Sequence, residues 1–523
     1  MNKLMLLLVL VFMAQISNAQ SVFKFTDFHD MDSTIKRSQG TYFYGLEEGL
    51  WKYWYKDGKI REEANYIEGK LNGSVKIWFN NGQAQNEGFF RFNIQDSAYI
   101  SWFTDGKIKS IGQFDYGFKD SIWNYYFPNG KLYKQELWDK RNVKVVEARA
   151  LDGTITLTEG NGLVNKYVGE EIISVSNYSK GALNGEYISY FQTGSKKEKG
   201  SYVSGLKDGE WEVYYASGQI KRFETFLNGE RQGKMEAFFE GGEPRVAGVY
   251  IAGKKNGFWK FWSDNNKIYM KGFFLKNLQD STWTYFYENS SQKESEGNFK
   301  DGKKNGEWRF WYRTGEVWRK GMYSSGQKNG LWSTWFESSQ KLQEGNYKNG
   351  KEQGIWTSWY DSGAKKDEGN FEAGLMEGHW KGWYENGKMN YEGDIENGLK
   401  EGDWAFWFSS GREREKGGYE NGFKDGHWQY FYPKGGVRQE GPHKYNRQIG
   451  EWKYFLDYGQ LQRVMNYKKG KLDGKTEIYY SGGSIMAINF YKSGKQNGTW
   501  EIFKEDGSVL KTIKYENGKK ISN

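Results

Sequence analysis

The chain has 523 residues, of which 68 are glycine, 4 are proline, 18% are aromatic and none is cysteine. The lack of cysteine excludes disulfides, a thiol nucleophile and cysteine-ligated zinc, and only four histidines are available for metal binding. The net charge of +9 is the balance of 75 basic and 66 acidic residues that alternate along the chain. Nucleic-acid-binding proteins instead cluster basic residues on one face or helix. We therefore expect solvated charged strands and no nucleic-acid partner.

The first nineteen residues have the three parts of a secretory signal peptide. Lys3 gives a positive start, residues 4–13 are all apolar, and Ser17-Asn18-Ala19 places small residues at a cleavage site. This apolar run is too short to span a bilayer, which takes ~20 residues. The sequence predicts cleavage after Ala19 and an exported protein that is periplasmic, on the cell surface or secreted. An uncleaved anchor is the alternative.

From residue 40 onward the chain repeats one unit of 24 residues, whereas residues 20–39 lack the pattern and are predicted to be an N-terminal lead or cap. With Trp356 as position 0, glycines fall at −2, +7, +13 and +18, and aromatic residues at 0, +3, +4 and +15. Position +3 is aromatic in all eighteen units. The origins of these units are Trp51, Val75, Tyr99, Trp123, Tyr187, Trp211, Met235, Trp259, Trp283, Trp308, Trp332, Trp356, Trp380, Trp404, Trp428, Trp452, Thr476 and Trp500.

Each unit is predicted to be a two-stranded hairpin. The first strand, from about −1 to +5, is rich in Trp, Tyr, Phe and Thr, which favour a half-buried pleated surface. Asn-Gly and Asp-Gly at +5 to +7 supply the positive φ angles of tight turns, and a second glycine-rich turn, such as residues 349–354, leads to the next unit. Links this short join antiparallel neighbours. The predicted fold is all-β: an extended, twisted antiparallel sheet or solenoid of about 18 tandem hairpins, each advancing by roughly 10 Å.

The register also predicts two sets of structural residues. Alternation places positions 0 and +4 on one face and +3 on the other, and glycine at +13 should make room for a tryptophan of the neighbouring strand. The expected aromatic rows include Trp308, Trp311, Trp332, Trp335, Trp356, Trp359, Trp380, Trp383, Trp404, Trp407 and Trp428. The expected turn glycines are Gly315, Gly330, Gly354, Gly363, Gly378, Gly387, Gly402, Gly411 and Gly426.

The repeats form two blocks. Residues 40–146 hold four units, and residues 163–523 hold one degenerate unit followed by fourteen clear ones. Between them, residues 147–162 are an irregular β insertion with an alternating strand at 154–158. We favour a lengthened hairpin for this insertion over a joint between domains.

The segment Gly369-Asn370-Phe371-Glu372-Ala373-Gly374, continued by Gly378-His379-Trp380, resembles the MORN repeat. The doubled aromatic in Trp383-Tyr384-Glu385-Asn386-Gly387 resembles the bacterial MORN-variant repeat, over nearly all of residues 40–523. The resemblance implies stacked hairpins, scaffolding or protein–protein contact, and in some members lipid association. Members are often labelled antitoxins of toxin–antitoxin systems, which fits poorly with an export signal. Choline- and glucan-binding repeats share the aromatic composition, but their unit is nearer 20 residues.

The predicted function is an exported, non-enzymatic scaffold that contacts a protein or an envelope polymer, with only weak contact to membrane lipid. The alternative is an aromatic-rich module that binds carbohydrate or cell wall. No catalytic, cofactor-binding or metal-binding residue is predicted. Asp301-Gly302 lacks the remaining ligands of a calcium loop, and His379 and His427 occupy position −1, which other units fill with Glu, Leu or Ile. The sequence does not determine the oligomeric state.

Overall fold

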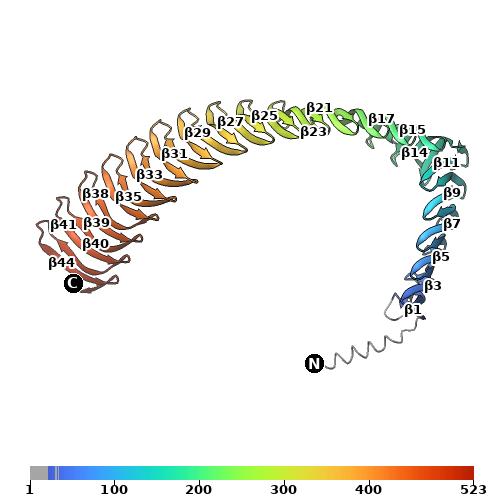
Figure 1. Cartoon of the computed structure of the whole chain (residues 1–523), viewed down its shortest axis with the longest axis horizontal. Helices are drawn as coiled ribbons and strands as arrows, with labels where there is room; N and C mark the ends of the chain where they lie inside the picture. Colours follow the sequence, from blue (N-terminus) through green and yellow to red (C-terminus); the bar gives the residue numbers. More distant parts are fainter. Residues whose placement is uncertain (1–21, 30–31, 33, 523) are drawn as a thin grey trace, which may run out of the picture. The chain divides into compact units, whose positions relative to one another are not determined.

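The computed structural model describes residues 22–29, 32 and 34–522, which form strands and turns without any helix. Thus no helix in this part of the chain is long and apolar enough to cross a membrane. The predicted signal peptide lies outside the described residues. Two compact units, Met1–Lys254 and Lys255–Asn523, each consist of strands that follow one another in sequence (Figure 1). Consecutive strands pair antiparallel, so the predicted all-β repeat of tandem hairpins is confirmed.

The strands of the first unit are β1 (Val22–Phe28), β2 (Lys36–Phe43), β3 (Leu46–Trp54), β4 (Ile60–Ile67), β5 (Lys70–Trp78), β6 (Ala84–Arg91), β7 (Ile94–Trp102), β8 (Ile108–Asp115), β9 (Phe118–Tyr126), β10 (Leu132–Asp139), β11 (Asn142–Arg149), β12 (Ile155–Thr158), β13 (Asn161–Val168), β14 (Glu171–Ser179), β15 (Ala182–Tyr190), β16 (Lys196–Val203), β17 (Leu206–Tyr214), β18 (Ile220–Leu227), β19 (Glu230–Phe238) and β20 (Pro244–Ile251).

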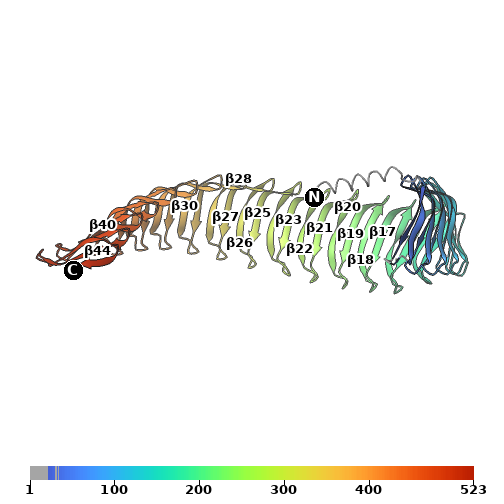
Figure 2. The same cartoon turned by 90° about the horizontal axis from the view of Figure 1, so that it is seen from below.

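The remaining strands, which lie side by side with hairpin turns at both ends (Figure 2), are β21 (Lys254–Trp262), β22 (Ile268–Leu275), β23 (Leu278–Phe286), β24 (Lys293–Lys300), β25 (Lys303–Trp311), β26 (Val317–Ser324), β27 (Gln327–Trp335), β28 (Lys341–Lys348), β29 (Lys351–Trp359), β30 (Lys365–Glu372), β31 (Leu375–Trp383), β32 (Met389–Glu396), β33 (Leu399–Trp407), β34 (Glu413–Glu420), β35 (Phe423–Phe431), β36 (Val437–Lys444), β37 (Arg447–Gln448), β38 (Gly450–Phe455), β39 (Leu461–Lys468), β40 (Lys471–Tyr479), β41 (Ile485–Lys492), β42 (Lys495–Gln496), β43 (Gly498–Phe503), β44 (Val509–Glu516) and β45 (Lys519–Ser522).

The first strand of each hairpin begins earlier than the sequence predicted. β29 covers positions −5 to +3 of the Trp356 unit, and its partner β30 places Gly369 opposite Trp356. The predicted span of −1 to +5 is wrong at both ends, because the strand passes through the glycine at −2 and stops where Tyr360 begins the turn.

The turn predicted at +5 to +7 is confirmed. Tyr360 N donates to Ala364 O at 2.8 Å, Gly363 N donates to Tyr360 O at 2.9 Å, and Gly363 has a φ of 84°. The second turn is shorter than predicted and consists of Asn349-Gly350, with φ angles of 51° and 81°. Two successive residues with positive φ define the tight turn whose twist matches that of paired strands.

The glycines at −2 lie inside strands, which corrects their assignment to turns. Gly354 has a φ of 75° within β29, and the pairing of β29 with β28 shifts register there. An extra residue at positive φ produces a β-bulge, which glycine adopts without steric cost. Of the predicted turn glycines, Gly315, Gly363, Gly387 and Gly411 lie in turns, whereas Gly330, Gly354, Gly378, Gly402 and Gly426 lie within strands at positive φ.

Consecutive hairpins are linked by hydrogen bonds at both ends of their strands. At one end, Tyr360 Oη donates to Trp383 O of the next unit at 2.9 Å, and seven further tyrosines at position +4 make the same bond. At the other end, Gly350 N donates to Lys328 O, beside the preceding turn, at 2.9 Å. The side chain at +4 thus links neighbouring hairpins at the row of turns. The sequence had placed it on the same face as position 0.

Two irregular regions add strands to the repeat. In the predicted lead or cap, β1 pairs with β2. In the insertion at 147–162, β12 pairs with both β11 and β13, and Leu157 packs with Val145 in a buried cluster. Val145 N donates to Gly181 O, and Gly181 N donates to Gly160 O, each at 2.9 Å. The insertion therefore contributes a strand with its own small core.

Candidate functional site

Cross-strand pairing divides the side chains of each hairpin between two faces. Position 0 pairs with +13 and position +2 with +11, so these positions share one side, which we call the tryptophan face. Positions +1 and +3 pair with +12 and +9 on the other side, which we call the opposite face. The residue at −4 pairs with +15 of the preceding unit and lies on the tryptophan face, as Glu352 does with Tyr347.

The tryptophans at position 0 are the core of this single sheet. Trp308, Trp332, Trp356, Trp380, Trp404 and Trp428 are 0–9% exposed. Each lies against a glycine at +13 of the preceding hairpin, and any Cβ on Gly369 would overlap the Trp380 ring, as the sequence predicted. Most of these indoles also donate to a backbone carbonyl ten residues earlier, as Trp332 Nε1 does to Met322 O at 3.0 Å. Trp380 Nε1, by contrast, is buried without such a partner.

In seven units, a lysine at position −4 covers the buried tryptophan. The ammonium lies 3.6–4.9 Å from the centre of the indole ring, within range of a cation–π interaction. We call each such place a lysine seat. Burial lowers the pKa of the lysine in six of the seven seats, namely Lys119, Lys255, Lys304, Lys328, Lys400 and Lys424. The seat therefore holds an ammonium group that is partly removed from water.

In two units, a carboxylate at +11 of the preceding hairpin pairs with the lysine at −4: Lys207–Glu198 at 2.6 Å and Lys424–Glu415 at 2.7 Å. In a third unit, Arg231 at −4 pairs with Glu224, which occupies +13 of the preceding hairpin, at 2.9 Å. A complete seat consists of an indole below the cation, aromatic rings at its sides and a carboxylate in front of it. Charge-assisted bonds are stronger than neutral ones, so this arrangement compensates for burial of the ammonium.

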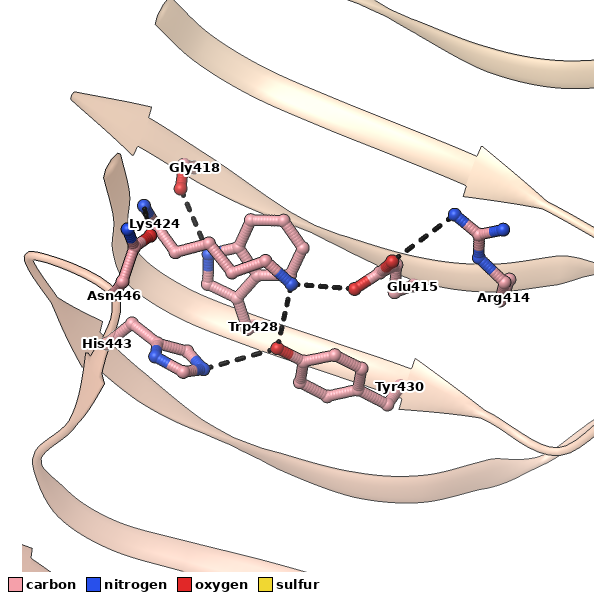
Figure 3. Close-up of polar contacts among 8 residues, drawn as sticks. All are labelled: Arg414, Glu415, Gly418, Lys424, Trp428, Tyr430, His443 and Asn446. Atoms are coloured by element: carbon pink, nitrogen blue, oxygen red, sulfur yellow. Dashed lines mark hydrogen bonds and ion pairs between the residues drawn. The ribbon is translucent and has the colours of Figure 1, made fainter. Parts of the chain in front are cut away.

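The seat at Trp428 also contains a buried histidine (Figure 3). Lys424 Nζ lies 3.6 Å from the indole centre and donates to Tyr430 Oη at 3.0 Å as well as to Glu415. Tyr430 Oη is 3.2 Å from His443 Nε2. Burial and the nearby Lys424 charge lower the pKa of His443 to about 4. His443 is therefore neutral at neutral pH.

On the opposite face, the +3 aromatics form a row that remains partly accessible. Trp311, Trp335, Trp359, Trp383 and Trp407 are all half-buried. Lysines at +9 lie beside them, as Lys341 does at 5.3 Å from the Trp359 ring centre. The same Lys341 pairs with Glu344 at 2.9 Å. The rings on this face therefore lie among charges that already have partners.

A hollow of about 480 Å³ interrupts the tryptophan face between β28 and β32. Its walls include Tyr347, Trp356, Phe371, Trp380 and Tyr391. The carboxylates of Glu352 and Asp367 also line it. Tyr391 Oη donates to Asp367 Oδ1 at 2.7 Å, and Ser358 Oγ donates to Oδ2 at 3.0 Å. Both carboxylate oxygens are thereby held in place.

This hollow exists because several repeat positions depart from their usual residues. Position +2 is aromatic in units such as that of Phe310, but it is Ser358 and Gly382 here. Position −4 is Glu352 and then Met376, not lysine. Sequence reasoning missed the lysine seats and the hollow, although tabulating positions −4 and +2 across the units would have marked both.

The residues considered for chemistry do not assemble into a metal or catalytic cluster. Across the described ranges, no group of three or more His, Asp and Glu side chains is placed to hold a metal ion. His379 Nδ1 lies 2.8 Å from Asp394 Oδ1, and His427 Nε2 lies 3.6 Å from Glu440 Oε2. Both histidines are exposed and lie on the opposite face.

The geometry defines a β-hairpin repeat protein with an aromatic core and two chemically different faces. The MORN repeat variant family matches seven segments in the two units: residues 47–68, 119–140, 207–228, 304–324, 328–349, 376–397 and 424–445. Every match begins at position −4 and covers one hairpin. The chain is thus a MORN-variant repeat protein.

No curated protein matches the chain. Solved structures that match at low similarity include the Tc holotoxin pore of Photorhabdus luminescens, with 9% identity over 90% of this chain and 27% of that one and a TM-score of 0.13. The TcdB2–TccC3 structure has 9% identity over 94% of this chain and 31% of that one, with a TM-score of 0.13. The chain spans less than a third of the length of both, and nothing below depends on them.

Proposed function

We propose that this repeat scaffold is exported and binds a protein partner through its opposite face. The observation that carries the proposal is the row of half-buried aromatics at position +3, which is present in every unit. Tryptophan and tyrosine are enriched where proteins bind one another, because they bury a large area at little conformational cost. Lysines such as Lys341 already have an intramolecular partner, so a protein covering this face leaves few charges unpaired.

Export is supported by the N-terminal sequence. Lys3, the apolar run at 4–13 and Ser17-Asn18-Ala19 form the parts of a cleavable signal. We expect the first residue of the native protein to be Gln20. N-terminal sequencing that returns Met1 contradicts export and restores a cytoplasmic role, including that of an antitoxin.

The binding proposal is tested by cross-linking the tagged full chain in envelope extracts. We expect a cross-linked protein that is lost when Trp335, Trp359 and Trp383 are all replaced by serine. The matched control replaces Tyr445 and Tyr458, which are 60% and 64% exposed in turns, and should retain the product.

The same variants distinguish the carbohydrate alternative. If insoluble peptidoglycan captures the purified chain and the triple tryptophan variant escapes, while no protein cross-link depends on those residues, the ligand is a glycan. Equal cross-linking by the native and triple-variant chains contradicts a role for this face.

A further inference from the structure

The lysine seats show which chemical group the tryptophan face is built to hold. At Trp428, the ammonium of Lys424 lies 3.6 Å from the centre of the indole ring and pairs with Glu415 at 2.7 Å. Lys207 makes the same contacts with Trp211 and Glu198, at 3.6 Å to the ring centre and 2.6 Å to the carboxylate. The same geometry has thus formed twice around an ammonium supplied by the chain itself.

The unit of Trp380 retains the acidic half of this seat but has no cation. Asp367 occupies the +11 position that Glu198 and Glu415 hold before their lysines, whereas the residue at −4 is Met376. Within the described residues, Asp367 has no lysine, arginine or histidine nitrogen within 4.0 Å. The hydrogen bonds that its oxygens accept come from the neutral hydroxyls of Tyr391 and Ser358.

Residues of the adjoining Trp356 unit widen the hollow beside Trp380. Here position −4 is Glu352, which brings a second carboxylate to the hollow, and Trp356 is 9% exposed, compared with 0% for Trp428. Burial, followed by the hydrogen bond and the negative charge of Glu352, raises the pKa of Tyr347 to about 12. The result is a hollow of about 480 Å³ with aromatic walls and two carboxylates.

We propose that the hollow between β28 and β32 binds the ε-ammonium of a lysine side chain from a protein partner. Trp380 and Trp356 provide the ring faces, and Asp367 and Glu352 provide the charge. The partner's ammonium takes the place that a lysine at position −4 fills in other units, since this unit has Met376 there. The hydroxyls of Tyr391 and Ser358 keep Asp367 oriented toward that ammonium. This inference rests on the proposed protein-binding function and adds a second, charge-specific contact on the other face of the sheet.

The test uses the purified full chain and the lysine analogue Nα-acetyl-lysine methylamide, with binding followed by ligand-observed NMR at low salt. We expect Asp367→Asn to weaken binding by about tenfold, because the charge-assisted bond is lost. Met376→Lys should abolish binding while preserving the fold, since the chain then fills its own seat. Glu392→Gln is the matched control, because it removes one carboxylate from the opposite face of the same unit and should leave affinity within about twofold.

Two comparisons decide whether the seat is specific. The Nε-acetylated analogue, which has no ammonium, should not bind. Equal binding of both analogues, or equal loss in Asp367→Asn and Glu392→Gln, overturns the proposal in favour of diffuse attraction. Binding of glucosamine without binding of the lysine analogue also overturns it, in favour of an amino sugar. These results come from the purified chain, so they are independent of whether the cross-linking experiment finds a partner.

Discussion

Replacing Gly369 by alanine should displace a buried tryptophan in the next hairpin. A Cβ at this position would lie closer than 3.0 Å to three atoms of the Trp380 ring, a separation that real Cβ atoms essentially never show. The ring cannot move freely, because Trp380 is 5% exposed and packs with Trp404 and Phe371. Overpacking of this kind costs about 1–3 kcal/mol, and expelling the ring altogether approaches the ~3–5 kcal/mol of deleting a core tryptophan. We expect a loss of about 2–3 kcal/mol after subtracting the smaller gain from stiffening the unfolded chain.

The chain itself contains the compensating pair. At two places where the next origin is a smaller residue than tryptophan, position +13 is larger than glycine: Ala64 precedes Val75, and Met465 precedes Thr476. The double variant Gly369→Ala/Trp380→Val copies the Ala64–Val75 pair. Because the clash disappears with the indole, the double variant should cost no more than Trp380→Val alone. The coupling energy between the two sites should be about 2 kcal/mol.

Hydrogen exchange on the full chain measures the loss of local stability in these variants, because it gives opening free energies for β30 and β31 separately from distant hairpins. The control is Gly482→Ala, because a Cβ there meets nothing within 4 Å and the residue lacks a positive φ. Unchanged protection in Gly369→Ala refutes the steric argument. Additive costs in the double variant refute the link between glycine at +13 and tryptophan at the next origin.

Three further outcomes follow from named contacts. Gly363→Val should destabilise the fold by about 2 kcal/mol, because a β-branched residue is strained at positive φ. Lys365→Ala, which removes an exposed ion pair, should cost under about 1 kcal/mol. Equal shifts in thermal midpoint for the two variants contradict this expectation. Tyr360→Phe removes the bond to Trp383 O and should lower local protection by about 1 kcal/mol, with exposed Tyr458→Phe as the unaffected control. His443 binds a proton near pH 6.5 when unfolded but only near pH 4 when folded, so the unfolding free energy of β35–β36 should fall by up to about 3 kcal/mol as pH drops through this window. His443→Tyr should remove that dependence and the matched exposed variant His427→Gln should not; a pH profile that His443→Tyr leaves unchanged assigns it to other groups.

The period of the sequence was sufficient to predict the hairpin fold, because the pattern repeats at one register through most of the chain. Position 0 tryptophans and +13 glycines are large and small partners, so their contact followed from spacing alone. Strand limits did not follow, since glycine at −2 is typical of both a turn and a bulge. Three units have Ser97, Ser121 or Ser281 there, and all keep a positive φ. Each donates its hydroxyl to the aspartate just before it, a local signal that belongs to a bulge.

The candidate site was harder to predict because it consists of departures from the repeat. Met376, Ser358 and Gly382 are ordinary residue types, and they stand out only by the register positions that they occupy. In the sequence, Asp367 is one of many carboxylates on strands. Its importance follows from the equivalent residue Glu415, which pairs with a lysine, Lys424. The cross-strand register, which depends on the bulge at −2, was needed to see that equivalence.

The repeat architecture explains how one scaffold can carry a local site without loss of the fold. Trp380 leaves no room for a Cβ at Gly369, so the glycine cannot change while the indole is in place. Position −4 is different, because a lysine there covers the indole from above and Met376 packs against the same cluster. Removing the ammonium therefore leaves the aromatic core intact and frees Asp367 to bind a charge from outside. Since each hairpin is stabilised mainly by its neighbours, such a change at one unit does not propagate along the sheet, and binding specificity can arise unit by unit.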